Sequence, residues 1–406
     1  RIQGHPLPPD MKPIPLITAA MAATIASSAP AADAQKRPVS YYKEIRPIFQ
    51  ANCQGCHQPA KARGGYVMTD FKKLLGGGEK DGVAIVPGDA SKGSLLEQIT
   101  PKDGQAEMPK NKPPLHEIEI ALIRQWIGEG AKDDTPTDAK KHFDAANPPS
   151  YSRLPVVASI DLSPDSSLVA VAGFHEIILH KTDGSGVAAR LIGMSERVQS
   201  VRFSPDGKRL AAAAGDPGRL GEIQIWDVAS KELKVSAPVG WDTLYGVSWS
   251  PDSAKIAFGC PDNTVRAIDA SNGKQILQMG SHNDWVLETT FNAAGDHVIS
   301  VGRDMTAKLS ELESQRFIDN ITSITPGALR GGINSVDRHP VDNTVVVGGA
   351  DGAPQLFQIF RTSARKIGDN ANLIRKHAEL PGRIFAVRVS GNGKRFIAGS
   401  ALDGSG

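Results

Sequence analysis

Short apolar segments alternate with tight polar turns throughout the second part of the chain. In Val201 to Gly207 an alternating segment ends in a Ser-Pro-Asp-Gly turn, and the apolar segment Leu210 to Ala214 follows directly. Alternation of period two predicts a strand with one buried face, and Ser, Pro, Asp and Gly favour tight turns. Further strands are predicted from Lys255 to Gly259 and from Ile223 to Val228. The pattern therefore predicts a region of many short strands.

This unit of strand and turn is repeated. The proline position of the turn falls at residues 164, 205, 251, 293, 340 and 391, which gives spacings of 41, 46, 42, 47 and 51 residues. A period of about 40 to 50 residues is typical of the blades of a β-propeller. Residues 156–406 are therefore predicted to form a propeller with about five complete blades and a partial sixth. Because the sixth repeat stops where a third strand is expected, the ring is expected to be truncated here and to continue beyond this sequence.

The repeats resemble those of WD-repeat proteins. Trp226-Asp227 is an intact copy of the dipeptide that names the family. In the fourth repeat Ser281-His282 stands where Gly-His is usual, Ser300 and Asp304 occupy positions of the family's hydrogen-bonded tetrad, and Ser310 replaces its tryptophan. The resemblance implies a structural role for these side chains, so we do not expect a catalytic Ser-His-Asp triad. By analogy of fold, it also implies a platform on which a protein partner docks.

Ahead of the repeats, the apolar positions change to helical spacing. They recur every three or four residues up to Gly128, which predicts an amphipathic helix. Residues 135–155 are polar and contain Pro148-Pro149, so a linker is predicted there. The apolar positions of the predicted helix are Leu115, Ile118, Leu122, Ile123, Trp126 and Ile127.

A different apolar run lies near the N-terminus. Met11-Lys12 precedes the mostly apolar segment Ile14 to Ala26, and the small residues Ala29 to Ala34 follow it. This order predicts a secretory signal peptide at residues 11–34, with residues 1–10 upstream of the true start. No later run reaches the roughly 18 apolar residues of a membrane span. The expected protein is exported and soluble, on the periplasmic or cell-surface side.

Composition narrows the class of protein further. The 406 residues include 46 Lys+Arg and 44 Asp+Glu, so the basic excess of a typical nucleic-acid-binding protein is missing and no nucleic-acid partner is expected. The length favours more than one domain. Three cysteines are too few for a disulfide scaffold, which leaves their chemistry open to another use.

Two of the three cysteines lie in Cys53-Gln54-Gly55-Cys56-His57. This spacing is the signature of covalent haem attachment, in which Cys53 and Cys56 form thioethers and His57 ligates the iron. Half of a zinc site is one alternative, but no second pair of cysteines or histidines follows to complete four ligands. A thioredoxin-like redox pair is the other alternative, and it lacks a βαβ context. The motif therefore predicts haem c as the cofactor.

A six-coordinate haem iron needs a second axial ligand. Met108 lies 51 residues after His57 in a polar, proline-rich loop, which can hold a thioether over the iron without burying it in a core. Met68 and His116 are the alternatives. Met68 favours a core or strand position, and His116 favours solvent at the start of the predicted helix. His57 and Met108 are therefore the predicted metal ligands.

Residues 41–134 as a whole resemble a cytochrome c domain of the type found in planctomycete proteins. The resemblance implies an all-α domain with thioethers at Cys53 and Cys56, proximal ligation by His57 and distal ligation by Met108. It rests on Ile45-Arg46-Pro47-Ile48-Phe49, the Cys-x-x-Cys-His motif, Gly64-Gly65, Ile85-Val86-Pro87-Gly88, Ser94-Leu95-Leu96, Met108-Pro109 and Ile123-Arg124-Gln125-Trp126-Ile127.

Together these features predict a multidomain protein, an all-α cytochrome c domain followed by an all-β WD-repeat propeller. The expected function is one-electron transfer through covalent haem with a redox partner protein, while the propeller docks a partner and no catalytic residue is assigned. Two alternatives stay open. One is a haem-coupled dehydrogenase with an active site on the propeller. The other is a scaffolding or sensor protein in which the haem is a structural or sensing element.

Overall fold

The computed structural model of the chain describes residues 37–80, 82–110, 112–137, 143–153, 155–323, 329–364, 366 and 370–402. The predicted signal peptide at 11–34 and the preceding residues 1–10 lie outside the described residues. From Val39 onward the described residues belong to one compact unit. In this part of the chain, no helix is long and apolar enough to cross a membrane.

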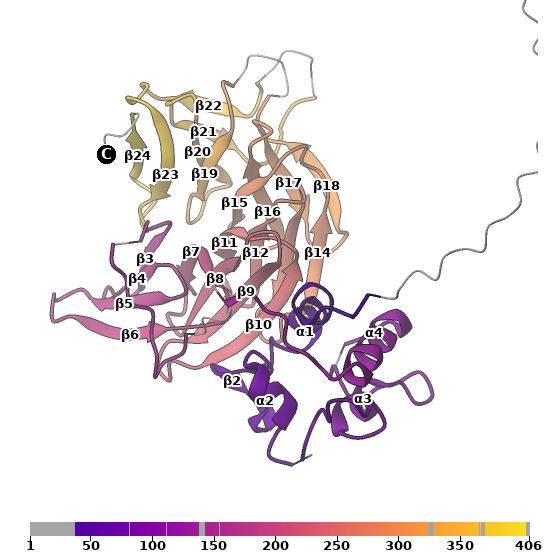
Figure 1. Ribbon diagram of the computed structural model, residues 1–406. Coiled ribbons are helices and arrows are strands. Elements are labelled where there is room, and N and C mark those ends of the chain that lie inside the picture. The colour runs from indigo at the N-terminus through magenta and orange to yellow at the C-terminus, as the bar shows by residue number, and fades with distance from the viewer. Residues whose placement is uncertain are drawn as a thin grey trace, which may run out of the picture. The chain divides into compact units, whose positions relative to one another are not determined.

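Short helices dominate the chain between residues 41 and 128 (Figure 1). Most of them are only one or two turns long, so their stability comes from packing against each other rather than from helix propensity. They are the π-helical turn Tyr41–Ile45, α1 (Arg46–Asn52), the 3-10 turn Arg63–Gly65, α2 (Phe71–Gly76), α3 (Ser94–Ile99) and α4 (Glu117–Gly128).

A two-stranded antiparallel sheet interrupts the helices directly after the cysteine motif. β1 (His57–Gln58) pairs with β2 (Lys61–Ala62), and His57 lies opposite Ala62. The chain reverses over Pro59-Ala60, where the proline favours a turn. The expectation of an all-α domain is therefore wrong for this region, because the residues after the second cysteine form a hairpin instead of a helix.

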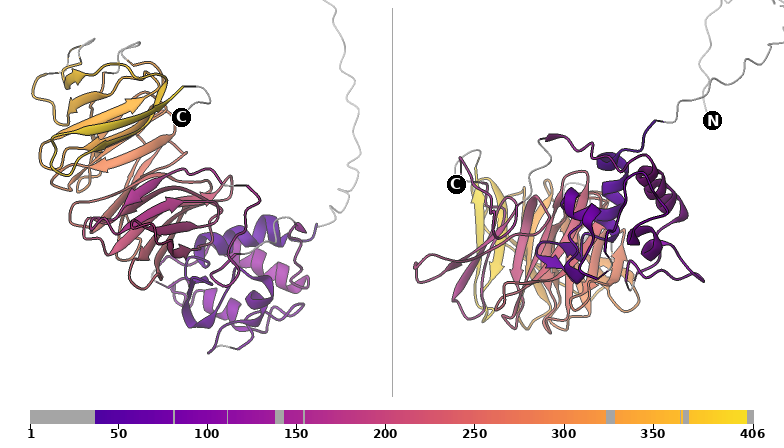
Figure 2. Two further views of the ribbon diagram at one scale, coloured as in Figure 1. Left: turned by 90° about the vertical axis from the view of Figure 1, so that its left-hand side faces the viewer. Right: turned by 60° about the horizontal axis from the view of Figure 1, so that its bottom comes forward.

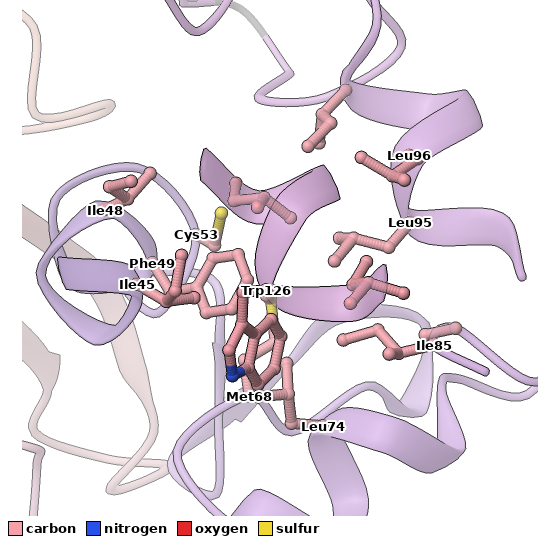
Figure 3. Packing of buried hydrophobic residues seen from close by; sticks show 14 of the residues in the cluster. Ile45, Ile48, Phe49, Cys53, Met68, Leu74, Ile85, Leu95, Leu96 and Trp126 are labelled. Carbon is pink, nitrogen blue, oxygen red and sulfur yellow. The ribbon is translucent and has the colours of Figure 1, made fainter. Parts of the chain in front are cut away.

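The helices bury one apolar core (Figure 3). Trp126 is 1% exposed, and its ring stacks on Tyr41 with 5.4 Å between the ring centroids. Its Nε1 donates a hydrogen bond to the carbonyl oxygen of Lys132 at 3.0 Å, so the polar end of this large side chain is satisfied. Cys53 and Met68 belong to the same core, which places the cysteine motif at its margin.

The predicted amphipathic helix is present as α4. His116 is its N-cap residue, and the backbone N–H of His116 donates to Glu119 Oε2 at 2.8 Å. Ile123 and Trp126 are buried as expected, whereas Ile118 is 71% exposed and does not contribute to the core. The buried face of the helix is thus narrower than the apolar pattern predicted.

In the described part of the chain, six antiparallel sheets follow in chain order, and we number them first to sixth. The first sheet contains β3 (Ile160–Leu162), β4 (Leu168–Ala172), β5 (Ile177–Lys181) and β6 (Val187–Leu191). The second contains β7 (Arg197–Phe203), β8 (Arg209–Asp216), β9 (Leu220–Asp227) and β10 (Leu233–Gly240). The third contains β11 (Tyr245–Trp249), β12 (Lys255–Gly259), β13 (Val265–Asp269) and β14 (Gln275–Met279). The fourth contains β15 (Val286–Phe291), β16 (His297–Gly302), β17 (Ala307–Glu311) and β18 (Arg316–Asn320). The fifth contains β19 (Ile333–Arg338), β20 (Thr344–Gly349), β21 (Gln355–Gln358) and β22 (Leu373–Lys376), and the sixth contains β23 (Arg383–Val389) and β24 (Phe396–Ala401).

The sheets are consistent with a WD-repeat propeller, and the strand predicted from Lys255 to Gly259 is confirmed as β12. In each four-stranded sheet the strands pair in chain order, so every sheet is a simple meander. The first strand of each sheet packs beside the first strand of the next (Figures 1 and 2). We call these six strands, β3, β7, β11, β15, β19 and β23, the inner strands.

The inner strands are joined by hydrogen bonds from backbone to side chain. The backbone N–H of Phe203 in β7 donates to Asp161 Oδ2 of β3 at 2.7 Å. The same arrangement joins β11 to β7, β19 to β15 and β23 to β19. At the junction of β11 and β15, the Thr289 hydroxyl instead donates to the carbonyl oxygen of Gly246 at 2.7 Å. Neighbouring sheets are therefore fixed in register by specific bonds as well as by apolar packing.

The turn after each inner strand explains the Ser-Pro-Asp motif. In the second sheet, the backbone N–H of Arg209 donates to Ser204 Oγ at 2.9 Å, and that of Lys208 donates to Asp206 Oδ1 at 3.0 Å. Gly207 has φ of 70°, a left-handed conformation that glycine adopts without steric cost. The serine and aspartate thus satisfy backbone donors that the turn would otherwise leave unpaired.

Candidate functional site

The Cys-x-x-Cys-His motif forms a tight turn at the end of α1. The backbone N–H of Cys56 donates to the carbonyl oxygen of Cys53 at 3.0 Å, and the N–H of His57 donates to the same oxygen at 3.2 Å. This turn places both thiols and the imidazole within five residues of one loop. Both cysteines are free thiols, and burial raises the pKa of Cys53 to about 12, so that thiol is protonated at neutral pH.

His57 presents an imidazole with a buried nitrogen that makes no hydrogen bond. Nδ1 is buried and has no partner among the described residues, and the ring lies 5.3 Å from the ring of Tyr66, centroid to centroid. Burial lowers the pKa of His57, which favours the neutral imidazole that ligates metals. A buried nitrogen without a hydrogen bond lowers the stability of the fold. A cofactor ligated by the other nitrogen of the ring would fix the orientation of the imidazole and bring Nδ1 to a hydrogen-bond partner, which would remove this cost.

Met68 is held close to the motif but lies within the core. Its backbone N–H donates to the carbonyl oxygen of His57 at 2.8 Å, and its carbonyl oxygen accepts from Gln54 Nε2 at 3.0 Å. The Met68 side chain is 1% exposed among apolar neighbours. The core position expected for this residue is therefore confirmed, although the residue is not in a strand.

Met108 and His116 differ in what they contact. The backbone N–H of Met108 donates to the carbonyl oxygen of Gln98 at 3.0 Å, and its half-buried side chain packs against the core that contains Cys53. His116 is exposed at the start of α4. Met108 thus borders the same core as the motif, whereas His116 faces solvent. The assignment of Met108 as the distal ligand stays a prediction.

The donors at the motif fit a c-type haem. Two free thiols in one turn, a neutral imidazole with an unpaired nitrogen and a nearby thioether form the donor set that such a haem uses. Within the described residues, no group of three or more His, Cys, Asp or Glu side chains could hold a metal ion. A haem iron held by imidazole and thioether does not need such a group.

The tetrad residues of the fourth sheet form a buried hydrogen-bonded chain. His282 Nε2 lies 2.8 Å from Ser300 Oγ, and His282 Nδ1 lies 3.0 Å from Asp304 Oδ1. Burial acts to raise the pKa of Asp304, but hydrogen bonds and charge from His282 outweigh it and lower the pKa to about 2. Ser300 is 0% exposed, so no substrate can reach its hydroxyl. The structure confirms the structural interpretation of these residues.

A cavity of about 190 Å³ lies between the inner strands, and sequence analysis did not predict the ion pairs at its centre. Glu288 Oε1 accepts from Arg202 Nη2 at 2.8 Å and from Arg388 Nη2 at 3.0 Å. Glu288 Oε2 accepts from the backbone N–H of Val336 at 3.0 Å. The carboxylate therefore links four of the six sheets, the second, fourth, fifth and sixth.

A regular sequence position supplies most of the polar groups of this cavity. The residue two places before the first residue of each turn motif lines it in every repeat. A charged or hydroxyl residue that recurs at that place, two residues before the turn of every repeat, is the signal that could have revealed the cavity. These residues are Asp161, Arg202, Ser248, Thr290, Asp337 and Arg388.

Two family models match separate parts of the chain. A model described as planctomycete cytochrome C matches residues 53–112, and a model described as WD domain, G-beta repeat, matches residues 188–227. Each covers much less than half of the chain. They support the WD repeat directly and the cytochrome resemblance only as a local match.

Curated relatives match over longer stretches. Eukaryotic translation initiation factor 3 subunit I of Aspergillus oryzae is 24% identical over 59% of this chain and 75% of its own length. The same subunit from Coccidioides immitis is 25% identical over 51% of this chain and 63% of its own length. WD repeat-containing protein VIP3 of Arabidopsis thaliana is 25% identical over 36% of this chain and 49% of its own length.

These relatives correct two predictions. The expected function as an exported c-type cytochrome that transfers single electrons is wrong, because the relatives are translation initiation factor subunits and a WD-repeat protein rather than exported electron carriers. The expected periplasmic or cell-surface location is wrong for the same reason. The prediction extended the function indicated by the short motif Cys53 to His57 to the whole chain, although most of the chain consists of WD-like repeats.

Proposed function

We propose that this chain is a WD-repeat scaffold that docks a protein partner at the cavity between its inner strands. The observation that carries the proposal is the lining of that cavity, where each of the six sheets contributes a charged or hydroxyl residue at the same position of its inner strand. The order of acidic, basic and hydroxyl side chains differs between the two directions around the cavity. A partner with complementary groups would therefore bind in one orientation. The relatives from Aspergillus and Coccidioides are named as subunits, which agrees with a role in an assembly.

The proposed organisation keeps the domain boundaries of the sequence. Residues 41–134 form a cytochrome c-like domain, residues 135–155 a linker, and residues 156–406 the propeller. Two hydrogen bonds hold the C-terminal part of the linker in place. The Tyr151 hydroxyl donates to Glu176 Oε1 at 2.8 Å, and Arg190 Nη2 donates to the carbonyl oxygen of Pro149 at 2.7 Å. These bonds attach the end of the linker to the first sheet.

A haem c completes the proposal as a structural or sensing element of the scaffold. Cys53 and Cys56 would hold it through thioethers, with His57 and Met108 as axial ligands. When bound, the haem would supply a redox-active iron held by side chains of the chain itself. The chain's own residues do the rest. The turn at the end of α1 orients the thiols, and the hairpin β1–β2 holds His57 in place.

Docking at the cavity is tested by removing one charge without changing side-chain length greatly. Arg388→Gln takes away one of the two guanidinium groups on Glu288, whereas Lys394→Gln changes an exposed cation in the turn of the same sheet. Any protein captured by the full chain should be lost with Arg388→Gln and kept with Lys394→Gln, and its cross-links should map to the inner strands. Equal capture by both variants, or cross-links only to other faces, would overturn docking at this cavity.

Haem attachment is tested with the three cysteines. The full chain, produced together with a cytochrome c maturation system, should retain haem on a denaturing gel. The double variant Cys53→Ser with Cys56→Ser should lose it, because no thioether can form. Cys260 is buried in the propeller and gives the matched control, since Cys260→Ser should retain haem. Loss of haem from the wild type on the denaturing gel would contradict covalent attachment.

A further inference from the structure

The hairpin that carries His57 is bound to the outer strand of the second sheet. Gln58 follows His57 directly and is 1% exposed. Its Nε2 donates to Ser236 Oγ of β10 at 3.2 Å and to the carbonyl oxygen of Gln54 at 3.1 Å. Lys61 Nζ, on the other strand of the hairpin, donates to the carbonyl oxygen of Lys234 at 2.6 Å. Both strands of the hairpin therefore contact β10.

The cysteine loop itself approaches the same strand closely. A Cβ atom on Gly55 would lie 2.7 Å from the carbonyl oxygen of Ser236, a distance that real Cβ atoms do not show. Only glycine fits at position 55 at this approach. Ala60, at the turn of the hairpin, packs against the apolar core shared by the first and second sheets. The fit of the loop to the sheet thus involves backbone and apolar contacts as well as hydrogen bonds.

Ser236 also belongs to a buried polar network inside the second sheet. Its hydroxyl donates to Glu222 Oε1, while Gln224 Nε2 donates to Glu222 Oε2 at 2.8 Å. Trp226 Nε1 donates to Gln224 Oε1 at 3.0 Å. Glu222 is 0% exposed, so the loss of any one of its hydrogen-bond donors would lower the stability of the sheet. A continuous chain of hydrogen bonds therefore runs from Gln58 in the hairpin to Trp226 of the WD dipeptide.

The second sheet also reaches the proposed docking cavity. Its strands pair in the order β10, β9, β8, β7, so one edge contacts the cysteine hairpin and the other carries Arg202. Arg202 is one of the two guanidinium groups on Glu288. One rigid hydrogen-bonded sheet thus connects the cysteine motif to the cavity.

We propose that Gln58 and Ser236 couple the cysteine motif to the second sheet, so that attachment of haem stabilises this sheet and with it the docking cavity. The inference rests on the proposed haem attachment and specifies how that attachment regulates docking. A group bound to Cys53 and Cys56 restrains the loop, and a restrained loop holds Gln58 on Ser236 at a lower entropic cost. Since such coupling is reciprocal, a stable second sheet equally favours the attached state. Gln58 is then a positioning residue for His57 and not a ligand.

Hydrogen exchange in the full chain, with and without attached haem, measures the coupling. Backbone amides of β9 and β10 should exchange at least about fivefold more slowly when haem is attached. Amides of β17 and β18, two strands of the fourth sheet that contribute no residue to the cavity, serve as the internal reference and should not change. Gln58→Leu should retain haem on a denaturing gel but lose most of the protection in β9 and β10. Gln278→Leu changes an exposed glutamine on β14, the outer strand of the third sheet, and should behave as the wild type.

A second pair of variants keeps the test decisive if Gln58→Leu folds poorly. Ser236→Ala removes the hydroxyl between Gln58 and Glu222, and Ser236→Thr restores it in a residue suited to strands. The alanine variant should lose the haem-dependent protection, and the threonine variant should recover it. Haem retained with equal exchange in both states would overturn the coupling alone. Absence of covalent haem from the wild type would overturn haem attachment and the coupling together, so the two failures are distinguishable.

Discussion

The second and fourth sheets satisfy the same structural need with different residues. In the fourth sheet, His282, Ser300 and Asp304 form a hydrogen-bonded chain, but Ser310 stands on the third strand in place of a tryptophan. Its hydroxyl is buried and has no hydrogen-bond partner among the residues that the structure describes. In the second sheet, Trp226 is present on the third strand. Glutamine, glutamate and serine side chains take the place of the histidine and aspartate there.

The two networks also differ in where they end. The chain through His282 closes within the fourth sheet. The chain through Glu222 extends to Ser236 on the outer strand and from there to Gln58 of the cysteine hairpin. The comparison shows that a repeat that departs from the usual tetrad can gain a contact outside the propeller. The following changes test whether the two networks are equivalent in stability and opposite in their response to pH.

The largest effect is expected from removing the central acceptor of the second sheet. Glu222→Ala leaves the donors of Ser195, Ser236 and Gln224 unpaired in a buried site. Unfolding of the full chain in urea should show a loss of ~3 kcal/mol in the free energy of unfolding. Glu313→Ala, at an exposed glutamate, provides the control and should change it by less than ~0.5 kcal/mol. A small effect of Glu222→Ala would mean that the network is not important for stability.

The pH dependence of stability should separate the two sheets. The pKa of Asp304 is lowered to about 2, so its stabilising contribution is present above its usual pKa of about 3.9 and is lost as the pH falls through about 2. Burial raises the pKa of Glu222, so its contribution is present below its usual pKa of about 4.3 and is lost as the pH rises through the raised value. The contribution of Asp304 is therefore lost as the pH falls, whereas that of Glu222 is lost as the pH rises.

Isosteric amides reveal each loss separately. The difference in unfolding free energy between the wild type and Asp304→Asn should shrink by ~2 kcal/mol between about pH 5 and pH 2. The corresponding difference for Glu222→Gln should instead change in favour of the variant as the pH rises above about 4.3. Urea unfolding at several pH values gives both curves. The same direction of change in the two variants would contradict the contrast between the sheets.

The smallest effects come from two buried serines of the fourth sheet that are alike in exposure and unlike in bonding. Ser300 and Ser310 are both 0% exposed, but only Ser300 is bonded to His282. Ser300→Ala should lower the free energy of unfolding by ~1 kcal/mol, whereas Ser310→Ala should leave it unchanged or raise it by up to ~1 kcal/mol. Thermal unfolding of the two variants, each the control of the other, decides this. Equal destabilisation by both would show that the Ser310 hydroxyl is satisfied.

Local sequence signals predicted the parts of the fold that depend on neighbouring residues. A short apolar segment located β12, helical spacing located α4, and the serine-proline-aspartate motif located the turns. Each of these features is decided by residues a few positions apart, so periodicity and turn chemistry are sufficient to find it.

The features that the sequence did not reveal depend on distant partners. The outer strands β6, β10, β14, β18 and β22 show little regular alternation of buried and exposed positions, so three strands per repeat were predicted instead of four. The bond from Gln58 to Ser236 joins residues 178 positions apart. Arg202 and Arg388 meet at Glu288 only once the inner strands lie side by side. Helical spacing likewise placed Ile118 in the core, whereas the tertiary packing leaves it in solvent.

The bonds between inner strands have a direction, and this constrains how such a chain can be rearranged. At the junctions of β3 with β7, β7 with β11, β15 with β19 and β19 with β23, the later strand donates a backbone N–H to a side chain of the earlier one. Ser200 and Ser335 stand at the same place, four residues before the turn, and both accept an N–H of the following inner strand. Asp161 and Asp337 likewise stand two residues before the turn and accept an N–H of the following inner strand. A circular permutation that keeps every neighbour would keep these bonds, and so would an exchange of repeats that carry the same acceptors. The side chains just before each turn therefore decide which repeats can stand next to each other.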